Sequence, residues 1–175
     1  MKRTGVFCVC TAMLALAGAA EAQSGRLSLE GRGGISLPTG QLEDGGASSG
    51  FSAALDMMYN LRPWLSAFGG VSRDEFDGDF SSTGLQAGAK LIMMERGSVM
   101  PWATAGFLMQ ELNADGAESG LEPGFEGGAG ADIAISPRFS LSPAVRYRAY
   151  DAGILPGEIE ARYFVLTLGA HLHLR

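Results

Sequence analysis

Cysteine is almost absent from this chain, and its absence excludes several kinds of chemistry. The 175 residues contain two cysteines, Cys8 and Cys10, and both lie in an apolar stretch near the N-terminus. If that stretch is removed, no thiol remains, which excludes disulfide bonds, thiol catalysis and cysteine–metal sites. Lysine is scarce as well, because Lys90 is the single lysine after residue 22.

The first residues have the organisation of a secretory signal. Lys2 and Arg3 precede an apolar run that ends at Ala20-Glu21-Ala22. This order predicts a signal peptide over residues 1–22, cleaved before Gln23. The apolar run covers only about fifteen residues, whereas a transmembrane helix needs about twenty. The sequence therefore predicts a secreted domain that spans residues 23–175.

The mature chain is acidic and suits a single domain. Removing Lys2, Arg3 and Glu21 from 13 basic and 19 acidic residues leaves 11 and 18, a net charge of −7. This balance argues against nucleic acid as a partner. The remaining 153 residues can form one hydrophobic core but not two comfortable ones.

Apolar and polar residues alternate along eight stretches. In the last of them one parity is Phe164, Leu166, Leu168, Ala170, Leu172 and Leu174, and the other is Tyr163, Thr167, Gly169, His171, His173 and Arg175. Alternation of this kind indicates a strand with one oily face and one polar face. The predicted strands are nine to fourteen residues long, as tilted membrane strands are and strands of soluble proteins seldom are. They cover residues 26–38, 50–59, 64–72, 84–94, 100–111, 125–135, 140–150 and 161–174.

The connections between these stretches alternate in length. Long ones are expected at residues 41–49, 73–83, 112–124 and 151–160, and short ones at 61–63, 95–99 and 136–139. Short turns on one rim and long loops on the other are typical of outer-membrane barrels. No segment after the signal peptide has helical periodicity. The predicted fold is therefore all-β, an eight-stranded antiparallel up-and-down transmembrane β-barrel.

The charged residues within the strands favour a polar interior. In the first, second, fourth, sixth and seventh strands one parity carries no charge and the other carries four acids and four bases, and a narrow lumen has to pair buried charges of this kind. Glu126 and Asp132 are expected to face Arg146 and Arg148. Eight strands enclose a space that side chains fill, so no open pore is expected. The predicted lumenal ion-pair network is Glu30, Arg32, Asp56, Lys90, Glu126, Asp132, Arg146 and Arg148.

One feature leaves this assignment of faces open. Phe68, Trp102 and Leu108 fall on the polar parity of the third and fifth strands, where the pattern is unclear. A soluble, lipocalin-like ligand-binding barrel with its faces inverted is the corresponding alternative.

Acidic residues concentrate in the predicted long connections. The segment Asp74-Glu75-Phe76-Asp77-Gly78-Asp79 resembles part of a calcium loop, but the alternating ligand spacing and the final glutamate are missing. A solvated rim is therefore expected, and whether these loops bind divalent cations stays open. The acids assigned to outward loops are Asp74, Glu75, Asp77, Asp79, Asp115, Glu118, Glu122, Glu158 and Glu160.

Two segments resemble a known family. The opening stretch Gly31-Arg32-Gly33-Gly34-Ile35-Ser36-Leu37-Pro38-Thr39-Gly40 and the closing stretch Thr167-Leu168-Gly169-Ala170-His171-Leu172-His173-Leu174 are similar to the first and last strands of small outer-membrane β-barrel proteins of the OmpA-transmembrane-domain and OmpX type. In this resemblance Thr167, Gly169, Leu172 and Leu174 correspond to the signal that the barrel assembly machinery reads. Family members commonly end on an aromatic residue, whereas this chain has Leu174 and Arg175.

The resemblance implies a location and a role. We expect a monomer in the outer membrane, with a periplasmic N-terminus, extracellular long loops and a structural or surface-interaction role. Its expected partners are outer-membrane lipid, lipopolysaccharide and the barrel assembly machinery, with no cofactor.

A lipid-modifying enzyme is the second alternative. Some eight-stranded outer-membrane barrels are lipid A deacylases or palmitoyl transferases that use a His with a Ser and a carboxylate. This chain has two histidines, His171 and His173, but lacks the His-x-Ser motif. No carboxylate or cysteine lies near them in the sequence. We therefore predict no catalytic residue and no metal ligand.

Overall fold

The computed structural model describes residues 27–77, 80–93, 98–114, 117–154 and 157–174. The predicted signal peptide, Asp79 and Asp115 lie outside the described residues, as does the side chain of Glu158. Within these ranges no helix is long and apolar enough to cross a bilayer.

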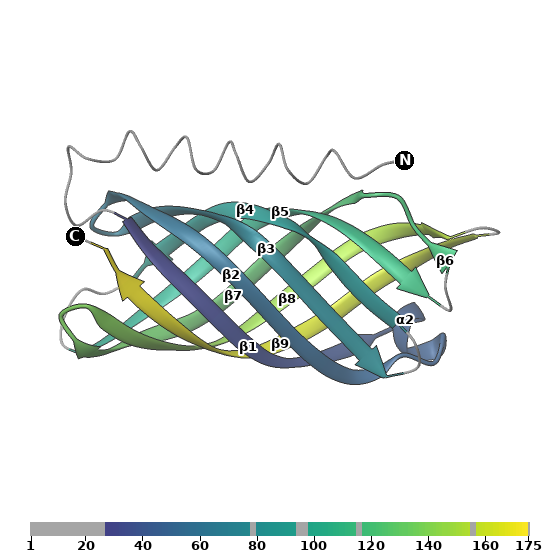
Figure 1. The fold of residues 1–175 in the computed structure, drawn as a ribbon, viewed down its shortest axis with the longest axis horizontal. Coiled ribbons are helices and arrows are strands. Elements are labelled where there is room, and N and C mark those ends of the chain that lie inside the picture. Colours follow the sequence, from purple (N-terminus) through teal and green to yellow (C-terminus); the bar gives the residue numbers. More distant parts are fainter. Residues whose placement is uncertain (1–26, 78–79, 94–97, 115–116, 155–156, 175) are drawn as a thin grey trace.

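Eight long antiparallel strands form most of the described chain (Figure 1). Each has 13 to 17 residues, and all except β1 are longer than the alternation predicts. A two-residue strand, β6 (Ala117–Glu118), pairs with the end of β5, and a single helical turn, α2 (Gln41–Asp44), follows β1. The long strands are β1 (Leu27–Thr39), β2 (Ser48–Arg62), β3 (Leu65–Asp77), β4 (Phe80–Ile92), β5 (Val99–Ala114), β7 (Glu122–Ser136), β8 (Phe139–Ile154) and β9 (Gly157–His173).

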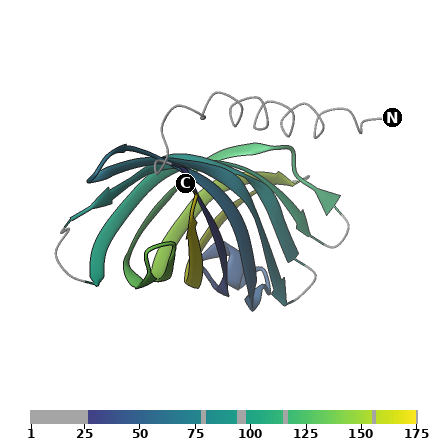
Figure 2. The ribbon, with the colours of Figure 1, turned by 60° about the vertical axis from the view of Figure 1, so that its left-hand side comes forward.

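The sheet closes on itself because the first and last strands pair. Each strand pairs with its neighbours in sequence, and β1 pairs with β9. If the cross-strand partner of Leu29 in β1 is followed to the next long strand, and so on around the barrel, the path returns to β1 at Thr39. This residue is ten positions from the starting point. This stagger tilts the strands by roughly 40° from the barrel axis, within the usual range for closed barrels. Figure 2 shows the strands curving round this axis. The expected eight-stranded up-and-down barrel is confirmed.

The two ends of the barrel differ. The turn end holds the connections at residues 63–64 and 137–138, and the helix end holds α2 and β6 (Figure 1). The prediction of long loops at residues 73–83 and 151–160 is wrong. Most of both segments is strand, because the alternation continues through β3 to Asp77 and through β8 to Ile154. The helical turn was not predicted, since four residues carry too little periodicity to be recognised.

Even-numbered residues from β1 to β8 face the lumen, and odd-numbered residues do so in β9. Phe68, Trp102 and Leu108 are buried inside, so β3 and β5 keep the common parity. On the outer surface Phe107 is 79% exposed and Leu168 is 57% exposed. Large apolar side chains thus point out and charged ones point in, which contradicts the lipocalin-like alternative.

Glycines on the lumenal face of β7 leave room for large side chains from its neighbours. A Cβ on Gly130 would lie 2.6 Å from the Trp102 ring, and one on Gly128 would lie 2.8 Å from Cγ of Arg146. Such distances are well below van der Waals contact. The glycine-rich run in β7 therefore makes space for a packed interior.

Candidate functional site: the lumenal charge network

Glu126 lies at the centre of the lumen between two arginines of β8. Nη1 of Arg146 donates to its Oε1 over 2.6 Å, and Nε of Arg148 donates to its Oε2 over 2.8 Å. Nη2 of Arg32 lies 4.0 Å from the same Oε2. All four side chains are almost fully buried. One carboxylate thus faces three guanidinium groups from β1 and β8.

Asp74 is the second carboxylate that Arg148 contacts. Nη1 of Arg148 donates to Oδ2 of Asp74 over 2.6 Å, and the hydroxyls of Tyr163 and Ser36 donate to the same carboxylate over 2.8 and 3.0 Å. The prediction that Asp74 belongs to an outward acidic loop is wrong, because the side chain is fully buried. It shares the parity of Ser66 and Ser72, so the alternation, extended two residues further, would have placed it inside.

Gln86 joins this group to a second ion pair. Nη2 of Arg148 donates to Oε1 of Gln86 over 2.8 Å, and Nε2 of Gln86 donates to Asp56. Asp56 in turn forms a salt bridge with Arg32. The contacts therefore run from β3 and β8 across the lumen to β4, β2 and β1. Such a network cross-links strands that are not neighbours in the wall.

Asp132 is the centre of a separate cluster towards the turn end. Its carboxylate accepts bonds from Nζ of Lys90 at 2.8 Å, Nε1 of Trp102 at 2.9 Å and Oγ of Ser142 at 2.7 Å. The Lys90 ammonium also lies 4.6 Å from the Trp102 ring centroid, which adds a cation–π contact. The expected pairing of Asp132 with Arg146 and Arg148 is wrong, because Lys90 occupies that place from β4, on the other side of β5.

Glu30 differs from the other lumenal carboxylates. It is buried, yet the described residues offer its carboxylate neither an ion pair nor a hydrogen bond. With Asp74 included, the described part of the lumen holds five buried acids against four buried bases. The acids are Glu30, Asp56, Asp74, Glu126 and Asp132, and the bases are Arg32, Lys90, Arg146 and Arg148.

An apolar cluster closes the helix end of the lumen. Gly40 and Gly46, with φ of +61° and +98°, bracket α2 in conformations that favour glycine. The turn they define buries Leu42 completely, and Oε1 of Gln41 accepts a bond from the Glu160 amide of β9 over 3.0 Å. The cluster consists of Leu42, Ala47, Phe76, Leu112, Tyr150, Ala152, Ala161, Tyr163 and Val165.

Replacing Leu42 by alanine should lower the free energy of unfolding by about 2–3 kcal/mol, since it opens a cavity beneath α2. Urea titration of the refolded protein in micelles measures the change. Leu121→Ala is the control, because Leu121 is half exposed and its truncation should cost no more than about 0.5 kcal/mol. Equal costs at the two positions would show that Leu42 does not contribute to closing this end.

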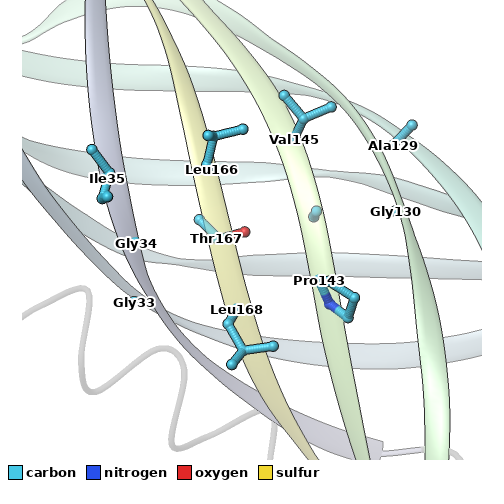
Figure 3. A pocket seen from close by; sticks show the side chains of 11 residues that line it. Gly33, Gly34, Ile35, Ala129, Gly130, Pro143, Val145, Leu166, Thr167 and Leu168 are labelled. Atoms are coloured by element: carbon cyan, nitrogen blue, oxygen red, sulfur yellow. The ribbon is translucent and has the colours of Figure 1, made fainter. Parts of the chain in front are cut away.

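The outer surface is an apolar belt. On β5 it runs from Val99 to Met109, which at a tilt of roughly 40° spans roughly 25 Å, the height of the apolar band in outer-membrane barrels. Exposed charged residues Arg73, Glu111 and Arg162 mark its limit towards the helix end. Figure 3 shows part of this belt, a shallow apolar groove whose lining includes Ile35, Val145, Pro143, Leu166 and Leu168.

The residues of the proposed assembly signal lie on or just beyond β9. Thr167 and Gly169 face the lumen, whereas Leu172 is exposed on the outer surface. Leu174 follows the end of β9, and its amide donates to the carbonyl of Leu27 over 2.9 Å. A Cβ on Gly169 would lie 2.6 Å from Oε1 of Glu30. Glycine at this position therefore makes room for a lumenal carboxylate.

The described residues do not assemble a hydrolase triad around the histidines. Nε2 of His171 lies 3.4 Å from Oγ of Ser28, a neighbour that the sequence did not suggest. However, Nδ1 of His171 is buried and has no hydrogen-bond partner among the described residues. The carboxylate that would orient a catalytic imidazole is therefore missing from this arrangement.

Comparison with known proteins identifies the architecture. No family model and no curated protein matches the sequence. Among solved structures, Neisserial surface protein A (NspA) is 17% identical, with a TM-score of 0.73 over 85% of this chain and 97% of that one. OprG of Pseudomonas aeruginosa is 13% identical (TM-score 0.56, 86% and 98% covered), and the N-terminal β-barrel domain of Pseudomonas aeruginosa OprF is 16% identical (TM-score 0.55, 85% and 98% covered). The fold is that of a small eight-stranded outer-membrane β-barrel.

Proposed function

We propose that this chain is an outer-membrane protein whose barrel has a structural or surface-interaction role and whose lumen is closed. Its N-terminus would lie in the periplasm with the turn end, and the helix end would face the exterior, as the usual orientation of short turns implies. It would contact outer-membrane lipid and lipopolysaccharide, and the barrel assembly machinery would read Thr167, Gly169, Leu172 and Leu174 on its last strand.

The placement of charge is the observation that carries this proposal. In the part of the chain that the structure describes, nine charged side chains are buried within a closed wall, while large apolar side chains such as Phe107 and Leu168 are exposed outside it. Exposure of this apolar surface to water would be unfavourable in free energy, whereas lipid acyl chains would solvate it. The lumen is filled by side chains that are joined by hydrogen bonds and salt bridges. At the helix end it is covered by the apolar cluster that includes Leu42. These features support a membrane scaffold in preference to a pore.

Cell fractionation followed by a gel-mobility assay tests the location. The protein should sediment with outer membranes and require detergent for extraction. Unheated samples in cold detergent should migrate differently from boiled samples, because the closed ladder of backbone hydrogen bonds resists the detergent until heated. A protein that stays in the soluble periplasmic fraction and shows one mobility would contradict the proposal.

A further inference from the structure

The two histidines share the turn end of the lumen with a methionine from another strand. Nε2 of His171 and Sδ of Met58 lie 2.9 Å apart, although 113 residues separate them in sequence. The ring centroid of His173 is 5.1 Å from that of His171. Two imidazoles and a thioether therefore converge on one region of the lumen.

Strand register explains this convergence. Ser28 on β1 is the cross-strand partner of Met58 on β2 and of His173 on β9. Because the serine side chain is short, the Met58 thioether can reach across β1 to His171. Replacement of Ser28 by a bulky residue would separate the two donors. The three donors thus come from β2 and β9 on either side of one small residue.

We propose that Met58, His171 and His173 form a binding site for a soft monovalent metal ion, Cu(I). Imidazole and thioether ligands favour this ion, whereas Zn(II) and harder cations favour carboxylate, thiolate or additional imidazole ligands. The described residues contain no cluster of three His, Cys, Asp or Glu side chains that could hold such a cation.

The donor geometry needs only a small adjustment to accept an ion. Bonds as long as those of zinc to imidazole and thiolate, about 2.0 Å and 2.3 Å, with a tetrahedral angle at the ion, place the two ligand atoms roughly 3.5 Å apart. The Met58 side chain must therefore retreat by roughly half an ångström, which its flexible, unbranched chain allows. Nδ1 of His171 has no partner within the described ranges, so the ring is held by hydrogen bonds only through its Nε2 contacts with Ser28 and Met58.

The strand register also places a buried carboxylate beside this site. Glu30 is the cross-strand partner of His171 on the same lumenal face. It is the buried carboxylate without an ion pair among the described residues, and the lumen has one more acid than base. A monovalent cation beside His171 would balance this charge. His173 is less buried than His171, so it gives the site a route from the turn end.

Methyl NMR and metal competition test this site on the refolded barrel in micelles. With ¹³C-methyl methionine, one equivalent of Ag(I), a redox-inert substitute for Cu(I), should shift the Met58 methyl resonance and leave that of Met57 unchanged. Met57 is the matched control, because it is adjacent in sequence and faces outward. Competition with a chromophoric Cu(I) chelator should give one bound ion per chain.

Variants separate this site from adventitious binding. Met58→Leu should weaken Cu(I) binding at least tenfold, whereas Met57→Leu should leave it unchanged, with folding of both checked by gel mobility. Unaltered binding by Met58→Leu, or no response of the Met58 methyl group to one equivalent of Ag(I), would overturn the proposal. If Met58→Leu fails to fold, the wild-type Ag(I) titration decides the question alone.

Discussion

Replacing Glu126 by glutamine should lower the free energy of unfolding by about 3–5 kcal/mol, the cost of removing one partner from a buried ion pair. Glutamine keeps the size of the side chain but cannot neutralise Arg146 and Arg148, which donate to Glu126 over 2.6 and 2.8 Å. Since Arg148 has no exposed surface, bulk water cannot replace the lost charge. Urea titration in micelles or liposomes measures the loss.

Glu75→Gln is the control for this experiment. Glu75 pairs with Arg73 over 2.7 Å, but both side chains are more than half exposed, so the variant should lose less than about 1 kcal/mol. The double variant Glu126→Gln, Arg146→Met should recover part of the loss, because it removes one uncompensated cation. Similar losses for Glu126→Gln and Glu75→Gln would contradict the role of the lumenal network in stability.

Replacing Leu168 by arginine should destabilise the barrel in liposomes by about 2–4 kcal/mol, as expected for a cation near the bilayer midplane. Leu168 is exposed on β9, between Leu166 and Ala170 on the outer face of the belt. Exposure to lipid, not packing within the protein, therefore sets the cost. Equilibrium unfolding in urea, with the protein inserted in vesicles, measures it.

Thr83→Arg provides the matched comparison. Thr83 is exposed on β4 at the margin of the belt, where its cross-strand partners are Arg73 and Glu111. Arginine at this depth should cost no more than about 1 kcal/mol, because its head group reaches water. Equal costs at positions 83 and 168 would show that the apolar belt does not lie in lipid.

The alternation of apolar and polar residues predicted which side chains face the lumen and which face outward, because the direction of a side chain in a strand depends only on the parity of its position. Parity alone therefore places Glu30, Arg32 and Glu126 on one face and Leu166 and Leu168 on the other. The same rule applied through β3 would have included Asp74, which a preference for acidic loops assigned elsewhere. Strand ends are harder to predict because hairpins can extend beyond the membrane without any change of pattern.

Parity does not specify which lumenal residues meet. That depends on the register between strands and on the stagger of the closed barrel, which no single stretch encodes. Asp132 therefore bonds to Lys90, 42 residues away, although Arg146 and Arg148 are closer in sequence. The contact between Met58 and His171 has the same origin, since it needs the registers of β1 with both β2 and β9.

The pairing of β1 with β9 also determines when the barrel can close during folding. The N-terminal strand must leave one edge unsatisfied until the final strand reaches it, and only then do Leu29 and Leu172 become neighbours. Contacts of such high sequence separation are slow to form. During that interval the exposed edge could accept a strand from another protein. A chaperone or insertase that holds this seam open would protect the chain from aggregation until its last residues arrive.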